Sequence, residues 1–343
     1  MSRSIGYRPG LFYTCLLTLV PTALLITMGA HTTSILAGMA FRDWPFSNGS
    51  INPEGWLSDP HMFAEHSHRL LGALVGLLAI VLAVWIHRVD GRGWVRWLGW
   101  SFLGLVIVQG LLGGLRVRLD QLNTGSATNI VAETFCVVHA IGAQIVVALL
   151  ATLILVQASA YAKAGRLERV PALRGLRLWG VISCGLLLAQ VALGAVVRHL
   201  DAGLSIPYFP HAAQDGSLIP DVWNQYIVMN FLHRVGAVAV SIALIGFTWK
   251  LSVNRTVRPI QRLGAYLIAS LLIVQVGLGA LTVWTLISAW VATAHLVVGA
   301  ALVSTTWLLT FSTFALPLRS VSRPAVSETV TPAASDRELV EIG

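Results

Sequence analysis

The stretch EHSHRLLGALVGLLAIVLAVWIH (residues 65–87) places an acid, two histidines and an arginine directly before a long apolar run. A matching stretch, NFLHRVGAVAVSIALIGFTW (residues 230–249), occurs in the second half of the chain, again with a His-Arg pair near its start. About 20 apolar residues are enough for an α-helix to cross the roughly 30 Å hydrocarbon core of a bilayer. The two stretches therefore predict two membrane-spanning helices, each with a histidine near one end.

The composition of the whole chain is that of a membrane protein. Of its 343 residues, 56% are hydrophobic and only 11% are charged, with a mean hydropathy of +0.75, whereas soluble domains are about a quarter charged. Because lipid offers no hydrogen-bond partner to an open backbone, each long apolar segment is expected to be a helix. We therefore predict an all-α integral membrane protein with eight transmembrane helices. The expected spans are residues 11–31, 66–87, 97–115, 135–159, 176–198, 226–249, 263–284 and 290–314.

The net charge of +8 reflects topology rather than a nucleic-acid partner. Most lysines and arginines lie at the N-terminus and in every second loop, which by the positive-inside rule places both termini in the cytoplasm. We expect no nucleic acid to bind, and expect the chain to lie in the inner (cytoplasmic) membrane of a bacterium. The basic residues on the expected cytoplasmic side are Arg3, Arg8, Arg88, Arg92, Arg96, Lys163, Arg166, Arg169, Arg174, Arg177, Lys250, Arg255, Arg258, Arg262, Arg319, Arg323 and Arg337.

The chain consists of two copies of one unit. His68-Arg69 aligns with His233-Arg234, and VIVQGLLGGLRV (106–117) aligns with LIVQVGLGALTV (272–283). With four spans in each copy, both copies have the same orientation and their symmetry axis is expected to follow the membrane normal. We predict two pseudo-symmetric four-helix bundles and a cytoplasmic tail. Their expected bounds are 1–160 for the N-terminal repeat, 161–318 for the C-terminal repeat and 319–343 for a disordered tail. The first segment is expected to be retained, since its counterpart is an internal span.

Four histidines lie at one expected depth, near the non-cytoplasmic ends of their helices: His68, His139, His233 and His295. Two imidazoles on different helices of a bundle can bind opposite faces of one heme iron. For a single buried histidine, packing or a hydrogen bond is an equally simple interpretation. Four histidines in two repeated pairs favour metal ligands, because ionisable groups in membranes are costly and usually functional. We predict one heme site for each pair.

Arginines accompany these histidines. Arg69 and Arg234 directly follow His68 and His233, where a guanidinium can hold a heme propionate by two hydrogen bonds. Arg116, Arg118 and Arg198 at other outer helix ends have two equal interpretations, either this role or the extension of a long side chain to the membrane interface.

The two copies differ at one position of chemical interest. Glu65 precedes His68 by three residues, whereas Asn230 occupies the equivalent position before His233. A partly desolvated carboxylate beside a heme can accept a proton or stabilise a developing cation. A simpler alternative is that a carboxylate is favoured near a helix N-terminus. The asymmetry favours chemistry in the first half alone.

In combination, five motifs resemble the heme A synthase family across all eight spans. They are the outer-loop DWP (43–45), EHSHRLLG (65–72), VVHAIGA (137–143), FLHR (231–234) and ATAHLVVGA (292–300). The resemblance implies a monooxygenase-like oxidoreductase that oxidises the C8 methyl group of heme O to a formyl group, giving heme A for terminal oxidases.

The resemblance also implies a role for each half. Heme b is expected as cofactor between His233 and His295, and heme O as substrate between His68 and His139, with Glu65 assisting oxidation. Heme O synthase and terminal oxidase assembly factors are the implied protein partners. The chain departs from many bacterial members at Phe41 and Ser47, where those members carry a cysteine pair.

Two other classes of function remain open. A di-heme electron-transfer cytochrome would need the four histidines but has no use for Glu65. A transporter built from parallel repeats would need a polar pathway near the midplane, where the main polar residues are Gln109, Gln190 and Gln275.

Overall fold

The computed structural model describes residues 7–125, 130–162 and 173–315. Within these ranges, eight helices are long and apolar enough to cross a membrane, and no strand is formed. This confirms the predicted all-α membrane fold. The eight long helices are α1 (Pro9–Ser34), α2 (Pro60–Val89), α3 (Gly93–Leu119), α5 (Ile130–Gln157), α7 (Arg174–His199), α8 (Gln225–Val253), α9 (Pro259–Trp284) and α10 (Ala289–Ala315). The short helices are α4 (Gln121–Thr124), α6 (Ser159–Ala162) and the 3-10 helix η2 (Ala202–Leu204).

Helices α2 and α8 each begin at a capping side chain, and α2 begins at Pro60, well before the expected start at residue 66. The Asp59 carboxylate accepts hydrogen bonds from the backbone N–H groups of His61 and Met62. Asn224, its counterpart in the second copy, caps α8 in the same way. Such caps satisfy backbone donors that have no partner within the helix. The first histidine of each pair consequently lies about two turns inside its helix.

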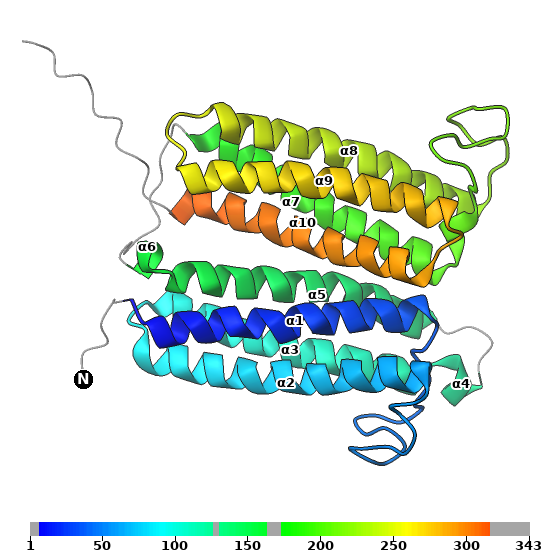
Figure 1. The fold of residues 1–343 in the computed structure, drawn as a ribbon, viewed down its shortest axis with the longest axis horizontal. Helices are drawn as coiled ribbons and strands as arrows, with labels where there is room; N and C mark the ends of the chain where they lie inside the picture. Colours follow the sequence, from blue (N-terminus) through cyan, green and yellow to red (C-terminus); the bar gives the residue numbers. More distant parts are fainter. Residues whose placement is uncertain (1–6, 126–129, 163–172, 316–343) are drawn as a thin grey trace, which may run out of the picture.

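The long helices form two four-helix bundles, one of α1, α2, α3 and α5 and the other of α7, α8, α9 and α10 (Figure 1). Contacts run α1–α2–α3–α5–α1 around the first bundle and α7–α8–α9–α10–α7 around the second. The same order of contacts in both bundles is compatible with the predicted pseudo-symmetry. The predicted tail, 319–343, lies outside the described residues.

The bundles meet along α1 and α5 of the first and α7 and α10 of the second. The indole N–H of Trp307 donates to the Thr152 hydroxyl at 2.8 Å, joining α10 to α5. Near the opposite end of α10, the hydroxyls of Ser34 and Thr293 lie 3.1 Å apart. The two copies are thus fixed to each other by specific polar contacts as well as by apolar packing.

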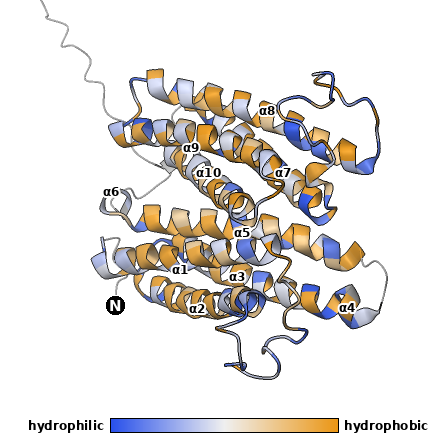
Figure 2. Ribbon diagram, turned by 45° about the vertical axis from the view of Figure 1, so that its right-hand side comes forward, coloured by the Kyte–Doolittle hydropathy of each residue, from blue (hydrophilic) through white to orange (hydrophobic). Residues whose placement is uncertain are grey.

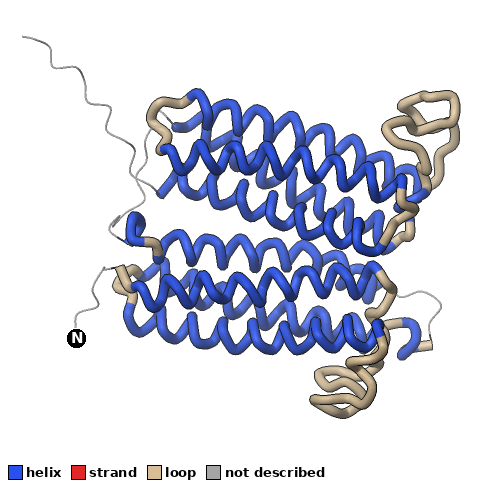
Figure 3. The backbone as a smooth tube through the Cα atoms, in the orientation of Figure 1, coloured by secondary structure: helices blue, strands red, loops and turns tan. Residues whose placement is uncertain are grey.

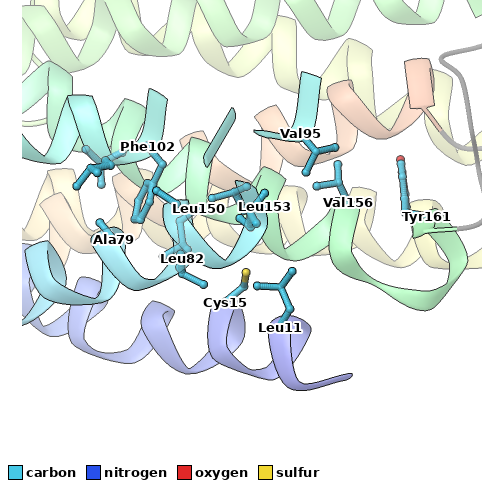
Figure 4. Close-up of a cluster of buried hydrophobic side chains, with 14 residues drawn as sticks. Leu11, Cys15, Ala79, Leu82, Val95, Phe102, Leu150, Leu153, Val156 and Tyr161 are labelled. Atoms are coloured by element: carbon cyan, nitrogen blue, oxygen red, sulfur yellow. The ribbon is translucent and has the colours of Figure 1, made fainter. Parts of the chain in front are cut away.

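Each bundle has its own apolar core, and both cores lie away from the histidines. Phe102, Leu150 and Leu153 are fully buried in the first core (Figure 4). Phe247 and Leu251 are fully buried in the core of the second bundle. The long helices are largely hydrophobic along their length (Figure 2). Many of their large apolar side chains are exposed, as expected of helices in contact with lipid.

The two longest described loops, residues 35–59 and 200–224, extend from the same end of the molecule (Figures 1 and 3). The helices that carry the four histidines, α2, α5, α8 and α10, all begin at this end. Each loop contains one cis X-Pro bond at equivalent positions, Trp44-Pro45 and Phe209-Pro210. In each bundle, the long loop and the helix ends that carry the histidine pair therefore lie at the same end.

Candidate heme-binding sites

The first pair of predicted ligands comes together in the structure. His68 on α2 and His139 on α5 have ring centroids 6.5 Å apart and ring planes at 79°. A metal ion midway between two imidazole nitrogens, with bonds of about 2 Å, places the centroids roughly 6 Å apart. The separation of this pair therefore fits two axial ligands on opposite faces of one heme iron.

The second pair occupies the equivalent position in the second bundle. His233 lies on α8 and His295 on α10, the counterparts of the helices that carry His68 and His139. The side-chain nitrogen of Gln190 lies 3.0 Å from His233 Nδ1, and that of Gln275 lies 3.3 Å from His295 Nε2. Among the described residues, no three histidine, cysteine or acidic side chains gather into a metal cluster. The arrangement thus consists of two histidine pairs.

The ring nitrogens of these histidines fit a metal-binding role. His68 Nδ1 donates to the carbonyl oxygen of Leu25 at 3.0 Å, which leaves Nε2 with the free electron pair that a metal needs. The Nδ1 atoms of His139 and His295 are buried and make no hydrogen bond. Buried polar atoms without a partner are uncommon because they cost free energy. The free Nε2 of His68 therefore fits a heme iron, as imidazole is a common axial ligand.

Arg69 and Arg234 are directed to the backbone of the outer loops. Arg69 Nη1 donates to the carbonyls of Asp43 at 2.7 Å and Phe46 at 2.5 Å, and Nη2 donates to that of Phe41 at 3.2 Å. Arg234 likewise donates to the carbonyls of Ile206, Tyr208 and His211. The two arginines are therefore loop anchors in this structure, a role that the sequence did not indicate. Their contact with a heme propionate stays a prediction.

Glu65 and Asn230 complete these anchors in chemically different ways. Glu65 is 4% exposed. Its Oε1 accepts a hydrogen bond from Arg69 at 2.6 Å, and its Oε2 accepts one from the Phe41 backbone N–H at 2.9 Å. Asn230 instead donates to the carbonyls of Ala202 and Gly203 and accepts from Arg234. Glu65 lies in the second turn of a helix capped by Asp59, and end effects fade within the first turn. The helix-terminus explanation for Glu65 therefore does not apply.

The other outer arginines also bind protein groups. Arg116 donates to the Gly38 carbonyl and Arg118 to that of Trp44, while Arg198 donates to the Ser34 hydroxyl at the junction of the bundles. His66 is buried beside this loop, with Nδ1 3.0 Å from the Ser47 hydroxyl. The sequence did not predict this contact, because residues 41–47 follow no periodic pattern from which their conformation could be inferred.

Comparison with known proteins places the chain in a family. A family model described as "Cytochrome oxidase assembly protein" (COX15-CtaA) matches residues 58–307. The chain belongs to this family. The region matched by the COX15-CtaA model includes all four histidines, Glu65 and both loop-anchoring arginines.

Several relatives carry the name heme A synthase, which confirms the resemblance found in the sequence. The protein from Symbiobacterium thermophilum is 31% identical over 263 residues, covering 75% of this chain and 80% of the relative. That from Erythrobacter litoralis is 31% identical, covering 71% and 72%. That from Geobacillus thermodenitrificans is 27% identical, covering 90% and 92%.

Proposed function

We propose that this protein is a heme A synthase, an integral membrane oxidoreductase that oxidises the C8 methyl group of heme O to a formyl group. The observation that carries the proposal is the His68–His139 pair, whose ring separation of 6.5 Å suits a six-coordinate heme. The pair recurs as His233 and His295, in a chain related to proteins named heme A synthase. The product would serve terminal oxidases.

The two sites have different proposed roles. His233 and His295 would hold heme b as the cofactor, and His68 and His139 would hold heme O as the substrate. Arg234 and Arg69 would support the respective sites from their positions one residue after a ligand. When bound, the heme irons supply the redox chemistry of the reaction. The assignment of substrate to the first half is supported by Glu65, since the second half has the neutral Asn230 at that position.

Glu65 is the proposed catalytic residue. Its carboxylate is buried three residues before His68, and hydrogen bonds from Arg69 and the Phe41 backbone hold it in one orientation. A fixed carboxylate in a site with little water stabilises positive charge that develops on a nearby carbon undergoing oxidation. Preorganisation by Arg69 and the outer loop would keep the side chain in place while the charge develops.

Co-expression with a heme O synthase, followed by pigment extraction, tests this function. We expect heme A from the wild type, and about 100-fold less from Glu65→Gln with an unchanged content of bound heme. Glu54→Gln is the matched control, because it makes the same change at an exposed position of the outer loop and should leave heme A formation intact. Normal heme A output from Glu65→Gln would remove Glu65 from the mechanism.

A di-heme b electron-transfer cytochrome is the second candidate. The observation that favours it is that both carboxylate oxygens of Glu65 are already hydrogen bonded to the protein, so that Glu65 has a structural use without any chemistry. Protoheme as the only extractable pigment, even with heme O synthase present, would support the cytochrome and contradict the synthase.

The proposed location is the inner membrane of a bacterium, with both termini in the cytoplasm and the heme sites toward the outer side. The distribution of lysine and arginine between alternate loops supports this orientation. Heme O synthase and terminal oxidase assembly factors are the proposed partners. A cysteine introduced at the exposed Leu57 should react in intact cells with a maleimide that cannot cross the inner membrane. Labelling only after lysis would reverse the orientation.

A further inference from the structure

Each of the four candidate ligands packs against a glycine on a neighbouring helix. His68 faces Gly29 of α1, His139 faces Gly113 of α3, His233 faces Gly194 of α7, and His295 faces Gly279 of α9. In all four cases, ring atom Cε1 is the atom nearest to the space that a β-carbon would fill, and Nδ1 is the next nearest. The same edge of every imidazole therefore lies against a glycine.

The space at these glycines is limited to different degrees. A β-carbon at Gly29 would lie 2.7 Å from Cε1 of His68, and one at Gly194 would lie 3.0 Å from Cε1 of His233. The corresponding distance is 3.3 Å at Gly279. At Gly113 it is 3.5 Å, an ordinary van der Waals contact that leaves room for a methyl group. Protein interiors are close-packed, so a methyl group at the first two positions would displace the ring.

We propose that Gly29, Gly113, Gly194 and Gly279 are positioning residues for the heme ligands. The missing side chain leaves a notch in the helix surface that receives the Cε1–Nδ1 edge of the imidazole and fixes the direction of Nε2. The proposal deepens the heme-binding role on which the proposed function rests. It also explains why glycine, a poor helix-forming residue, occurs in the interior of four spans.

Groups one turn before the glycine contact Nδ1 in two of the four cases, and the contact at His68 strengthens the assignment. Leu25 and Gln190 lie four residues, or about one helical turn, before Gly29 and Gly194. Both contact Nδ1 of the facing histidine at 3.0 Å, Leu25 through its backbone carbonyl and Gln190 through its side-chain amide. At His68, the turn that carries the notch therefore also supplies the acceptor that orients the ring and leaves Nε2 with a free electron pair. At His233, the amide nitrogen of Gln190 donates and Nδ1 accepts.

Close packing of helices is the other common reason for glycine in membrane spans. Gly99 is an example in this chain, because a β-carbon there would approach the backbone Cα of Ala83 at 3.6 Å. At the four notch glycines, by contrast, every atom near the added β-carbon belongs to an imidazole. A notch glycine is thus one whose added β-carbon would contact only an imidazole ring, whereas a helix-packing glycine is one whose added β-carbon would contact the neighbouring helix.

Glycine-to-alanine substitutions with controls on the same helices test the proposal. The notch variants Gly113→Ala, Gly194→Ala and Gly279→Ala are paired with Gly110→Ala, Gly185→Ala and Gly277→Ala. At the three control positions, nothing lies within 4 Å of the added β-carbon. Each purified protein is assayed for heme per polypeptide and for the low-spin g values of the ferric heme. Size-exclusion chromatography in detergent establishes that the variants fold.

We expect Gly194→Ala to bind heme about tenfold or more weakly, or to shift its g values, as when groups that orient a ligand are altered. The effect should decrease in the order Gly29, Gly194, Gly279, Gly113, following the available space. Controls should match the wild type. Wild-type heme content and g values in both Gly194→Ala and Gly279→Ala would overturn the proposal. This criterion holds whether or not a fourth variant, Gly29→Ala, folds.

The outcome is separable from that of the proposed function, because heme content and g values do not depend on heme A formation. A protein that makes no heme A but responds at the notches overturns the synthase assignment alone. A protein that makes heme A and shows no response at Gly194 or Gly279 overturns the notches alone.

Discussion

Arg69 Nη2 and Glu65 Oε1 lie 2.6 Å apart, and both side chains are largely buried, with 12% and 5% of their surfaces exposed. The same guanidinium donates to three carbonyls of the loop that follows α1. The acid proposed for catalysis is thus part of the structure that fastens this loop to α2. Any change at Glu65 affects both the charge near His68 and the position of the loop.

Arg69→Ala should loosen the loop formed by residues 41–47. Each lost hydrogen bond to a charged group contributes about 1.5–3 kcal/mol, so we expect limited proteolysis within this loop to become at least about tenfold faster. Arg118→Ala is the control, because Arg118 makes a single exposed bond to the same loop. Equal cleavage rates for the wild type and Arg69→Ala would contradict the anchoring role.

Gln190→Leu should alter the second heme site and leave the first unchanged. Removal of the amide takes away the hydrogen bond that its nitrogen donates to His233 Nδ1, and so changes the protonation and the orientation of this ring. We expect a shifted midpoint potential for one heme in a redox titration. Leu25→Ala is the counterpart control, because the backbone carbonyl that holds His68 survives the substitution. Two unchanged potentials in Gln190→Leu would exclude Gln190 as an orienting group.

Asp90→Asn should destabilise the end of the first bundle that lies away from the heme sites. Asp90 accepts hydrogen bonds from Arg92 and Gln157, and Asp90 and Arg92 are 5% and 7% exposed. Loss of the carboxylate charge leaves Arg92 buried without a counter-charge, which typically costs about 3–5 kcal/mol. We expect a lower apparent Tm in detergent at neutral pH, while Asp221→Asn, at an exposed loop position, should match the wild type.

The same ion pair predicts a pH dependence. Burial raises the pKa of Asp90, but hydrogen bonds from Arg92 and Gln157 outweigh this effect and hold the pKa below its usual 3.8. A lowered folded-state pKa stabilises the protein above the unfolded value, and this contribution is lost as pH falls through the folded value. The apparent Tm of the wild type should therefore fall more steeply than that of Asp90→Asn below about pH 4. Parallel curves for the two proteins would count against this assignment.

The positions of the helices could be predicted from the sequence because a bilayer leaves an apolar segment of about 20 residues one stable conformation. All eight expected spans lie on the helices of the structure, with helix ends differing by a turn or so where caps such as Asp59 extend them. The repeat, read from His68-Arg69 and His233-Arg234, predicts that His68 pairs with His139 and His233 with His295. These inferences depend on local composition and spacing, which the sequence contains directly.

Contacts between distant residues were decided by the tertiary structure. Glu65 meets the backbone of Phe41 through a loop without periodic pattern, so its bonding partners could not be inferred from its spacing to His68. The notch at Gly29 exists because α1 places that glycine beside the His68 ring. Sequence by itself determined the membrane fold, the repeat and the candidate ligands, since each follows from residue types along one segment. The orientation of those ligands depends on how neighbouring helices approach each other, and only the packed bundle determines that.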